Sequence, residues 1–245
     1  MIVDSTALPE QVVDDVVASA FGSAGQRCSA LRLLCLQEDI ADRVLEMLVG
    51  AMDTLVVGDP QDLATDIGPV ISAAAAGELA QHVVRMSQRG RLLKACTPPS
   101  PAAVAATAID PQRFIAPQLI ELDSVRDLDR EAFGPLLHVV RYAAQDLPRV
   151  LEELRANGYA LTLGIQTRLD GTRELVQAQS TAGNVYVNRN MVGAVVGVQP
   201  FGGSGLSGTG PKAGGPHYLT RFVTERTFTV NTTATGGNTA LLSLD

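Results

Sequence analysis

The sequence predicts an α/β fold, a largely parallel sheet flanked by helices. Short apolar runs typical of buried strands alternate along the chain with amphipathic segments of helical period, the order found in parallel sheets. The chain has 245 residues, of which 46% are hydrophobic and 18% charged. That composition is typical of a globular protein with a sizeable core.

The first half predicts three helices and one strand. A helix is expected over Pro9–Phe21, because proline suits the first helical position and valines recur at helical spacing. Residues 31–36 predict a buried strand that contains Cys35. A second helix follows over residues 40–55, and a third runs from about Ser72 to Gly90.

The second half alternates strands with helices. Strands are expected over 114–120 and 136–142, and Pro117 favours an edge or an irregularity for the first of these. A helix opens at Asp146 and ends by Gly158. The remaining elements are a strand over 161–166, a helix over 171–180, a strand over 184–188, and a terminal strand over 226–233.

Two stretches predict loops. Residues 97–111 are rich in proline and alanine, which is typical of a surface loop. Residues 189–217 are rich in glycine, and a loop of that length is usually functional.

Composition excludes several classes of function. The net charge of −7 disfavours binding to nucleic acid or to an anionic membrane surface. Three cysteines and three histidines without ligand spacing disfavour a disulfide framework or a metal site and indicate a reducing compartment, so a cytoplasmic location is expected. No segment resembles a signal peptide or approaches the ~20 apolar residues of a membrane span.

Cys28 is the candidate nucleophile. It follows the first helix in a glycine-flanked turn, with Arg27 and Arg32 close in sequence. A thiol attacks as thiolate, and nearby cations favour that form. The alternative is an inert, buried small residue. A Cys28–His217 pair, as in cysteine proteases, is a further alternative, although His217 is more simply a packing residue.

Two further motifs carry candidate site residues. In Glu131-Ala132-Phe133-Gly134-Pro135, a carboxylate can accept hydrogen bonds from a ribose diol and an aromatic ring can pack on a planar ring. The alternative is a solvated acidic turn. Segment 203–208 formally matches G-x-G-x-x-G, but the glycines and proline that follow forbid the helix of a dinucleotide fingerprint.

The cysteine segment, the Glu-x-Phe-Gly-Pro motif and Pro200-Phe201-Gly202-Gly203 together resemble the aldehyde dehydrogenase superfamily. Segment 212–219 is narrower and resembles L-glutamate γ-semialdehyde dehydrogenases. With segments 3–10 and 231–238, it looks similar to the dehydrogenase region of bacterial bifunctional proline-utilization enzymes.

The resemblance implies a role for each site residue. Cys28 adds to an aldehyde, and its backbone N–H forms half of the oxyanion hole. Glu131 and Phe133 hold the nicotinamide ribose and line the nicotinamide of NAD. FAD is implied only for a proline dehydrogenase domain outside this chain, and no metal is implied. The substrate-binding residues are Ser29, Gly193 and Ala194, which hold the α-carboxylate of the aldehyde substrate, and Phe201, which packs on its carbon chain.

The resemblance also implies three parts: the last helix of an NAD-binding domain over 1–22, the catalytic domain over 23–218, and a C-terminal segment over 219–245 whose strand supports homo-oligomers. The general-base glutamate and the rest of the NAD-binding domain are expected upstream of Met1. The chain is thus expected to be a fragment that is inactive alone. The alternative function is a non-catalytic remnant that associates with a full-length homologue.

Overall fold

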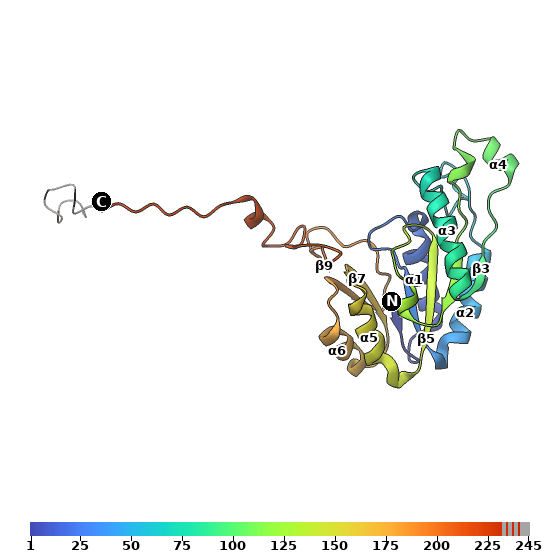
Figure 1. The fold of residues 1–245 in the computed structure, drawn as a ribbon, viewed down its shortest axis with the longest axis horizontal. Helices are drawn as coiled ribbons and strands as arrows, with labels where there is room; N and C mark the ends of the chain where they lie inside the picture. The colour runs from blue at the N-terminus through green and yellow to red at the C-terminus, as the bar shows by residue number, and fades with distance from the viewer. Residues whose placement is uncertain (232–233, 235–236, 238–239, 241–245) are drawn as a thin grey trace.

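The structure is a computed structural model that describes residues 1–231, 234, 237 and 240. One seven-stranded sheet runs through the body in the order β3-β4-β5-β2-β1-β7-β8 (Figure 1). Neighbouring strands are parallel except for β3 and β4, which are antiparallel. The predicted α/β fold with a largely parallel sheet is confirmed.

The strands of this sheet are β1 (Ile2–Val3), β2 (Leu33–Gln37), β3 (Arg91–Ala95), β4 (Gln118–Leu122), β5 (Leu136–Tyr142), β7 (Thr162–Gln166) and β8 (Asn184–Val187). A separate two-stranded sheet consists of β6 (Tyr159–Ala160) and β9 (Ser204–Gly205). The α-helices are α1 (Pro9–Phe21), α2 (Glu38–Asp53), α3 (Ala73–Arg89), α4 (Pro101–Ala105), α5 (Leu147–Ala156) and α6 (Asp170–Gln179).

Helices cover both faces of the sheet. On β2, Leu34 and Leu36 point into the core shared with α1 and α2, whereas Leu33 and Cys35 point into the core shared with α5 and α6. All five residues of this strand are buried, as a central parallel strand requires. Figure 1 shows α1 and α2 on one side and α5 and α6 on the other. The predicted core position of Cys35 is confirmed.

Residues 1–22 belong to this same body. β1 lies between β2 and β7 in the sheet, and α1 packs against α2. The expected boundary after residue 22 therefore does not separate two cores.

The edge of the sheet differs from the prediction. Sequence analysis missed β3, whose residues are exposed or half-buried and show no clear alternation. Because β3 pairs with β4, the strand next to Pro117 is not an edge strand. Pro117 instead precedes β4, where its carbonyl accepts from Cys96 N at 2.9 Å and its lack of an N–H costs no ladder bond. The predicted loop over 97–111 also contains the short helix α4.

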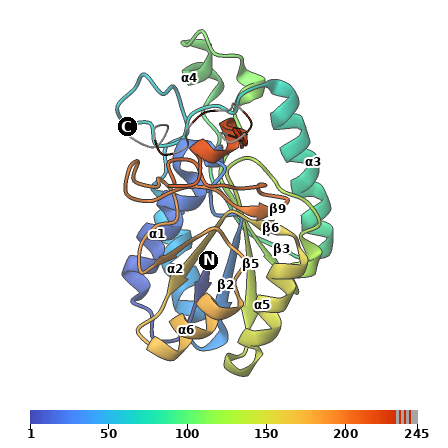
Figure 2. The ribbon, with the colours of Figure 1, turned by 90° about the vertical axis from the view of Figure 1, so that its left-hand side faces the viewer.

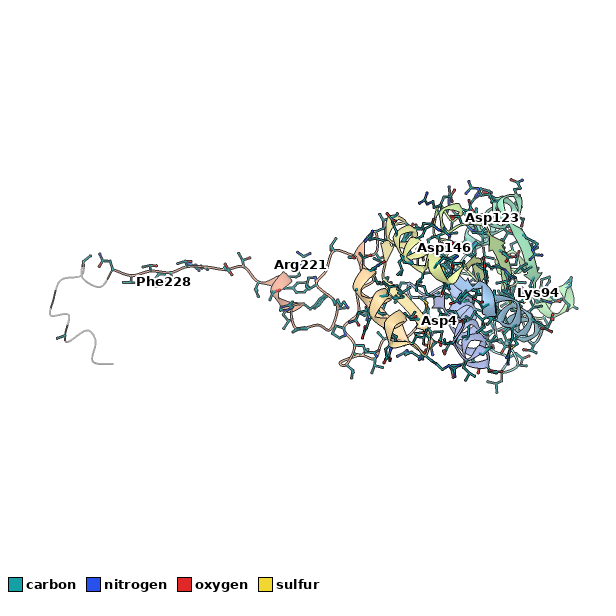
Figure 3. All side chains as sticks on the ribbon, turned by 90° about the horizontal axis from the view of Figure 1, so that it is seen from below. Asp4, Lys94, Asp123, Asp146, Arg221 and Phe228 are labelled. Atoms are coloured by element: carbon teal, nitrogen blue, oxygen red, sulfur yellow. The ribbon has the colours of Figure 1, made fainter. Side chains whose placement is uncertain are left out.

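The predicted terminal strand is wrong for the residues that the structure describes. Residues 226–231 form no strand, and the side chains of Phe228 and Val230 are 83% and 56% exposed. Figures 1 and 3 show this segment running away from the body, with Phe228 far from the sheet. A strand needs a neighbour for its backbone hydrogen bonds, and this segment has no strand beside it. The last two residues of the predicted strand, 232 and 233, lie outside the described residues.

The glycine-rich loop contains β9, which pairs with β6 (Figure 2). Residues 206–218 form turns and irregular structure and no helix. The G-x-G-x-x-G match is therefore not a dinucleotide fingerprint, as predicted. Within the described part of the chain, no helix is both long and apolar enough to cross a membrane.

A buried histidine pair ties α3 to the sheet. His82 Nε2 on α3 lies 2.9 Å from His138 Nε2 on β5, and both side chains are buried. His138 Nδ1 lies 3.0 Å from the Arg32 carbonyl, which can only accept, so Nδ1 carries the proton. His138 Nε2 then accepts from His82 Nε2, and Arg85 Nη2 donates to His82 Nδ1 at 3.5 Å. Every contact is satisfied when both rings are neutral.

This arrangement makes stability depend on pH. Burial lowers the pKa of His138 from 6.5 to about 4, and burial together with Arg85 lowers the pKa of His82. Because the folded state takes up protons less readily than the unfolded chain, this stability is complete above about pH 6.5 and is lost as pH falls towards 4. For His138 alone, the loss between pH 7 and pH 5 is about 2 kcal/mol.

We therefore expect the unfolding free energy, measured by urea titration, to fall between pH 7 and pH 5, and to fall less steeply in His138→Gln. The slope is the readout, so a lower overall stability of the variant does not obscure it. The control His217→Gln changes an exposed histidine and should keep the wild-type slope. Equal slopes for His138→Gln and wild type would contradict this account.

Candidate active site

The turn before Cys28 has an unusual backbone. Ser23, Ala24 and Gly25 follow one another with φ of 57°, 53° and 65°, in the left-handed region. This conformation is costly for residues other than glycine, so the surrounding contacts must hold it. A Cβ on Gly25 would lie 2.1 Å from the Gly134 carbonyl oxygen. Glycine at position 25 thus allows the cysteine loop to pack directly against the second motif.

Arg32 holds these two segments together. Its Nη1 donates to the carbonyl of Gly25 at 2.5 Å and to the carbonyl of Gly134 at 3.2 Å. Its Nη2 donates to the carbonyl of Arg27 at 3.1 Å. One guanidinium group therefore satisfies backbone acceptors on both sides of the contact. Its rigid geometry suits this task better than the flexible ammonium of lysine would.

Arg32 also contacts the candidate cofactor residues. Its Nε lies 3.4 Å from Glu131 Oε1, with the two side chains 12% and 36% exposed. Its guanidinium carbon lies 4.8 Å from the centroid of the Phe133 ring, a cation–π contact. Burial lowers the pKa of Arg32, and Glu131 opposes that shift. Glu131 is therefore ion-paired, not a merely solvated acid.

A pocket of about 350 Å³ lies beside Cys28. Cys28 and Phe133 come shortly before β2 and β5, and Thr162 begins β7; all three line the pocket. Because these strands are parallel, their amino ends meet at one edge of the sheet. The fold thus brings Cys28 into one pocket with Glu131 and Phe133, which lie more than 100 positions further along the chain.

Four other predicted site residues, all within the described part of the chain, do not line this pocket. Ser29 follows Cys28 but is only 5% exposed. Gly193 and Ala194 lie in the glycine-rich loop, where Gly193 has φ of 71° and a Cβ there would meet nothing within 4 Å. Phe201 forms a β-bridge with Ala213. The structure does not bring these four residues to the pocket wall.

Several lining residues escaped the sequence analysis, among them Arg130, Arg155, Thr162 and Met191. Arg130 directly precedes the motif Glu131–Pro135, so its place in the sequence could have indicated that it lies near the site. The others carry no motif and reach the pocket only through long-range packing.

His217 is exposed and is not a lining residue, so the predicted packing role is wrong and no pair with Cys28 forms in this pocket. Within the described ranges, no three His, Cys, Asp or Glu side chains could hold a metal ion.

Residues 1–228 match the aldehyde dehydrogenase family. The chain belongs to that family. It is 56% identical over 231 residues to "Bifunctional protein PutA" of Escherichia coli, and this alignment covers 92% of this chain and 17% of the relative. It is 35% identical over 222 residues to the 1-pyrroline-5-carboxylate dehydrogenase of Geobacillus thermodenitrificans, which covers 89% of this chain and 41% of the relative.

Solved structures agree with this aldehyde dehydrogenase assignment. A crystal structure of bifunctional proline utilization A superposes with a TM-score of 0.86 at 55% identity, over 96% of this chain and 23% of that one. A Thermus 1-pyrroline-5-carboxylate dehydrogenase with bound NAD has a TM-score of 0.80 at 34% identity, over 90% of this chain and 41% of that one. The chain therefore spans less than half the length of these relatives.

Thiol reactivity should single out Cys28. Cys28 is exposed, whereas Cys35 and Cys96 are buried. Burial raises the pKa of Cys35 to about 11 and also raises the pKa of Cys96. We expect iodoacetamide to modify Cys28 about tenfold faster than either other cysteine, measured by peptide mapping under native conditions. A Cys28→Ser chain should be nearly unlabelled, and equal rates at the three thiols would count against the nucleophile assignment.

Removing Arg32 should weaken the fold around the site. Arg32→Met leaves the Gly25 and Gly134 carbonyls without this donor and Glu131 without its cation. We expect the unfolding free energy in urea to fall by about 2–4 kcal/mol. The matched control Arg27→Met removes only an exposed bond to Ser23 Oγ and should cost under about 0.5 kcal/mol. Similar losses for both variants would show that Arg32 has no special role.

Proposed function

We propose that this chain supplies the catalytic cysteine, and the residues that contact the nicotinamide ribose, of an NAD-dependent L-glutamate γ-semialdehyde dehydrogenase in proline utilization. The observation that carries the proposal is the shared pocket of exposed Cys28 with Glu131 and Phe133. The identity to PutA and to 1-pyrroline-5-carboxylate dehydrogenases supports the choice of substrate. Because the chain covers only part of these relatives, the activity is proposed for the complete enzyme.

The lining residues fit the nicotinamide end of NAD. The Glu131 side chain is 36% exposed, so its carboxylate can accept from a ribose diol while Arg32 holds it. Phe133 is 45% exposed and has an aromatic surface for a planar ring. When bound, NAD accepts the hydride that leaves the substrate carbon. Glu131 and Phe133 would orient that cofactor beside Cys28.

Cys28 carries the covalent chemistry. Its thiolate adds to the aldehyde carbon, and the carbonyl oxygen becomes the oxyanion of a thiohemiacetal, which the Cys28 backbone N–H stabilises. Loss of hydride turns this adduct into a thioester. Water then attacks the acyl carbon, which releases glutamate and the free thiol. Among the described lining residues the only carboxylate is Glu131, already paired with Arg32, so the base for this last step is proposed to come from elsewhere in the complete enzyme.

The charge of the pocket favours an acidic substrate. Three arginines, Arg32, Arg130 and Arg155, line it together with the one carboxylate of Glu131. This excess of positive charge supports binding of a carboxylate. The groups that we propose to hold the α-carboxylate, the Ser29 hydroxyl and the backbone N–H groups of Gly193 and Ala194, lie off this pocket wall, so in the proposal the arginines attract the acidic substrate and these three groups bind its carboxylate.

The C-terminal segment supports a further part of the proposal, a homo-oligomer. Its exposed apolar side chains include Leu219, Phe222, Phe228 and Val230. Pairing of the extended segment with a second copy would cover these side chains and satisfy backbone groups of the segment.

Kinetics can test the function in an exchange enzyme, in which residues 1–228 replace the matching segment of E. coli PutA. Glutamate γ-semialdehyde should exceed hexanal in kcat/KM by a wide margin, because unpaired donors penalise a substrate without a carboxylate. Ser29→Ala should reduce the ratio of the two kcat/KM values by the equivalent of roughly 1–3 kcal/mol, which is the contribution of one charge-assisted hydrogen bond. NADH formation is the measurement.

Two controls sharpen this comparison. Phe201→Ala should weaken both substrates alike, since it contacts only the carbon chain in this proposal. Cys28→Ala should abolish oxidation and leave NAD binding intact. A preference for hexanal, or a margin that Ser29→Ala leaves unchanged, would refute the assignment of the carboxylate site. An inactive exchange enzyme that still binds a full-length homologue would favour the non-catalytic alternative.

A further inference from the structure

Ser19 lies between the cysteine segment and the glycine-rich loop. It is on the last turns of α1 and is fully buried. Its carbonyl accepts from Leu31 N at 2.9 Å, which it can do because the last carbonyls of a helix have no partner within the helix. Leu31 is three residues beyond Cys28. Ser19 therefore fixes the chain just after the nucleophile.

The hydroxyl of Ser19 holds the other segment. Ser19 Oγ accepts from Met191 N at 3.1 Å, and this hydrogen bond is buried. Met191 lines the same pocket as Cys28 and precedes Gly193 by two residues. One buried residue thus connects two segments: its backbone carbonyl holds the segment between Cys28 and β2, and its hydroxyl holds the start of the loop that carries Gly193 and Ala194.

A second residue on the same face of α1 reinforces this contact. Asp15, one helical turn before Ser19, accepts from Gln166 Nε2 at 2.7 Å, and both side chains are buried. Gln166 Nε2 also lies 3.5 Å from the carbonyl of Arg189. The Arg189 guanidinium donates to the Val192 carbonyl at 3.1 Å. Of these two polar residues of α1, Ser19 therefore contacts the segment 189–192 directly, and Asp15 reaches it only through Gln166.

Beyond these contacts the loop is open. A Cβ on Gly193 would meet no atom within 4 Å, and Val196 and Val198 are 96% and 73% exposed. The packing of the loop itself therefore does little to position Gly193, while Ala194 beside it is half-buried. Two hydrogen bonds hold the chain just before them, the one from Met191 N to Ser19 Oγ and the one from the Arg189 guanidinium to the Val192 carbonyl, and of these only the first joins the loop to α1.

We propose that Ser19 is a positioning residue that sets the distance between Cys28 and the carboxylate-binding N–H groups of Gly193 and Ala194, and so determines the preference for a carboxylate-bearing aldehyde. This inference rests on the proposed function. Losing the hydroxyl frees Met191 from α1, although the bond from Arg189 to Val192 remains, and it leaves Cys28 in place because the carbonyl of Ser19 still holds Leu31. The effect is thus confined to substrates that use the carboxylate site.

The test is Ser19→Ala in the exchange enzyme, assayed with glutamate γ-semialdehyde and with hexanal. We expect KM for the semialdehyde to rise about tenfold, with little change in kcat, in the parameters for hexanal, and in alkylation of Cys28 by iodoacetamide. Ser19→Thr keeps a hydroxyl and should restore most of the semialdehyde KM. The matched control Ser72→Ala also deletes a serine hydroxyl that accepts from a backbone N–H at 3.1 Å, from Ala75 at the start of α3, and should change neither substrate's KM.

The outcomes are distinct. If Ser19→Ala lowers kcat/KM equally for both substrates, or slows alkylation of Cys28, Ser19 is a general structural residue and the inference is wrong. If Ser19→Ala changes kcat/KM for neither substrate, the inference is also wrong, while the proposed function stands. If the unsubstituted exchange enzyme shows no preference for the semialdehyde, the proposed function itself fails.

Discussion

The site depends on the half-buried guanidinium of Arg32. Two chain segments about a hundred residues apart meet here backbone to backbone, with Gly25 against the Gly134 carbonyl. Such a contact leaves carbonyl groups that no helix or strand can satisfy, and burying them unpaired would cost free energy. Arg32 donates hydrogen bonds to both segments. It also forms an ion pair with Glu131 and a cation–π contact with Phe133. The contact that joins the segments therefore also orients the candidate cofactor residues.

This contact explains why the pocket lies at the amino ends of the strands. In many open α/β sheets the ligand lies at the carboxyl ends. Here the cysteine loop enters β2 and the acidic motif enters β5, and these neighbouring strands are parallel. Both loops must then lie at the same edge. The neutral histidine pair joins this arrangement to α3 through the carbonyl of Arg32.

Local signals predicted much of the fold and part of the site. The helix at Pro9–Phe21 was predicted with its observed bounds, since proline and the valine period act within the helix itself. β3 was missed because its mixed, half-exposed residues show no period, and it forms only through pairing with β4. The strand expected at residues 226–231 failed for the converse reason: β-branched residues favour extended backbone, but a strand requires a neighbour.

The sequence by itself determined which candidate reactive groups are present, a cysteine in a glycine-flanked turn and a Glu-x-Phe-Gly-Pro motif. It also determined the alternating strands and helices of an α/β fold. Residue type and local spacing carry that information, because they depend on short stretches of chain. Only the tertiary structure decided that Arg32 pairs with Glu131, that Ser19 reaches the backbone of Met191, and that Gly193 and Ala194 lie off the pocket wall. These relations join residues far apart in the chain, and the packing of sheet and helices sets them.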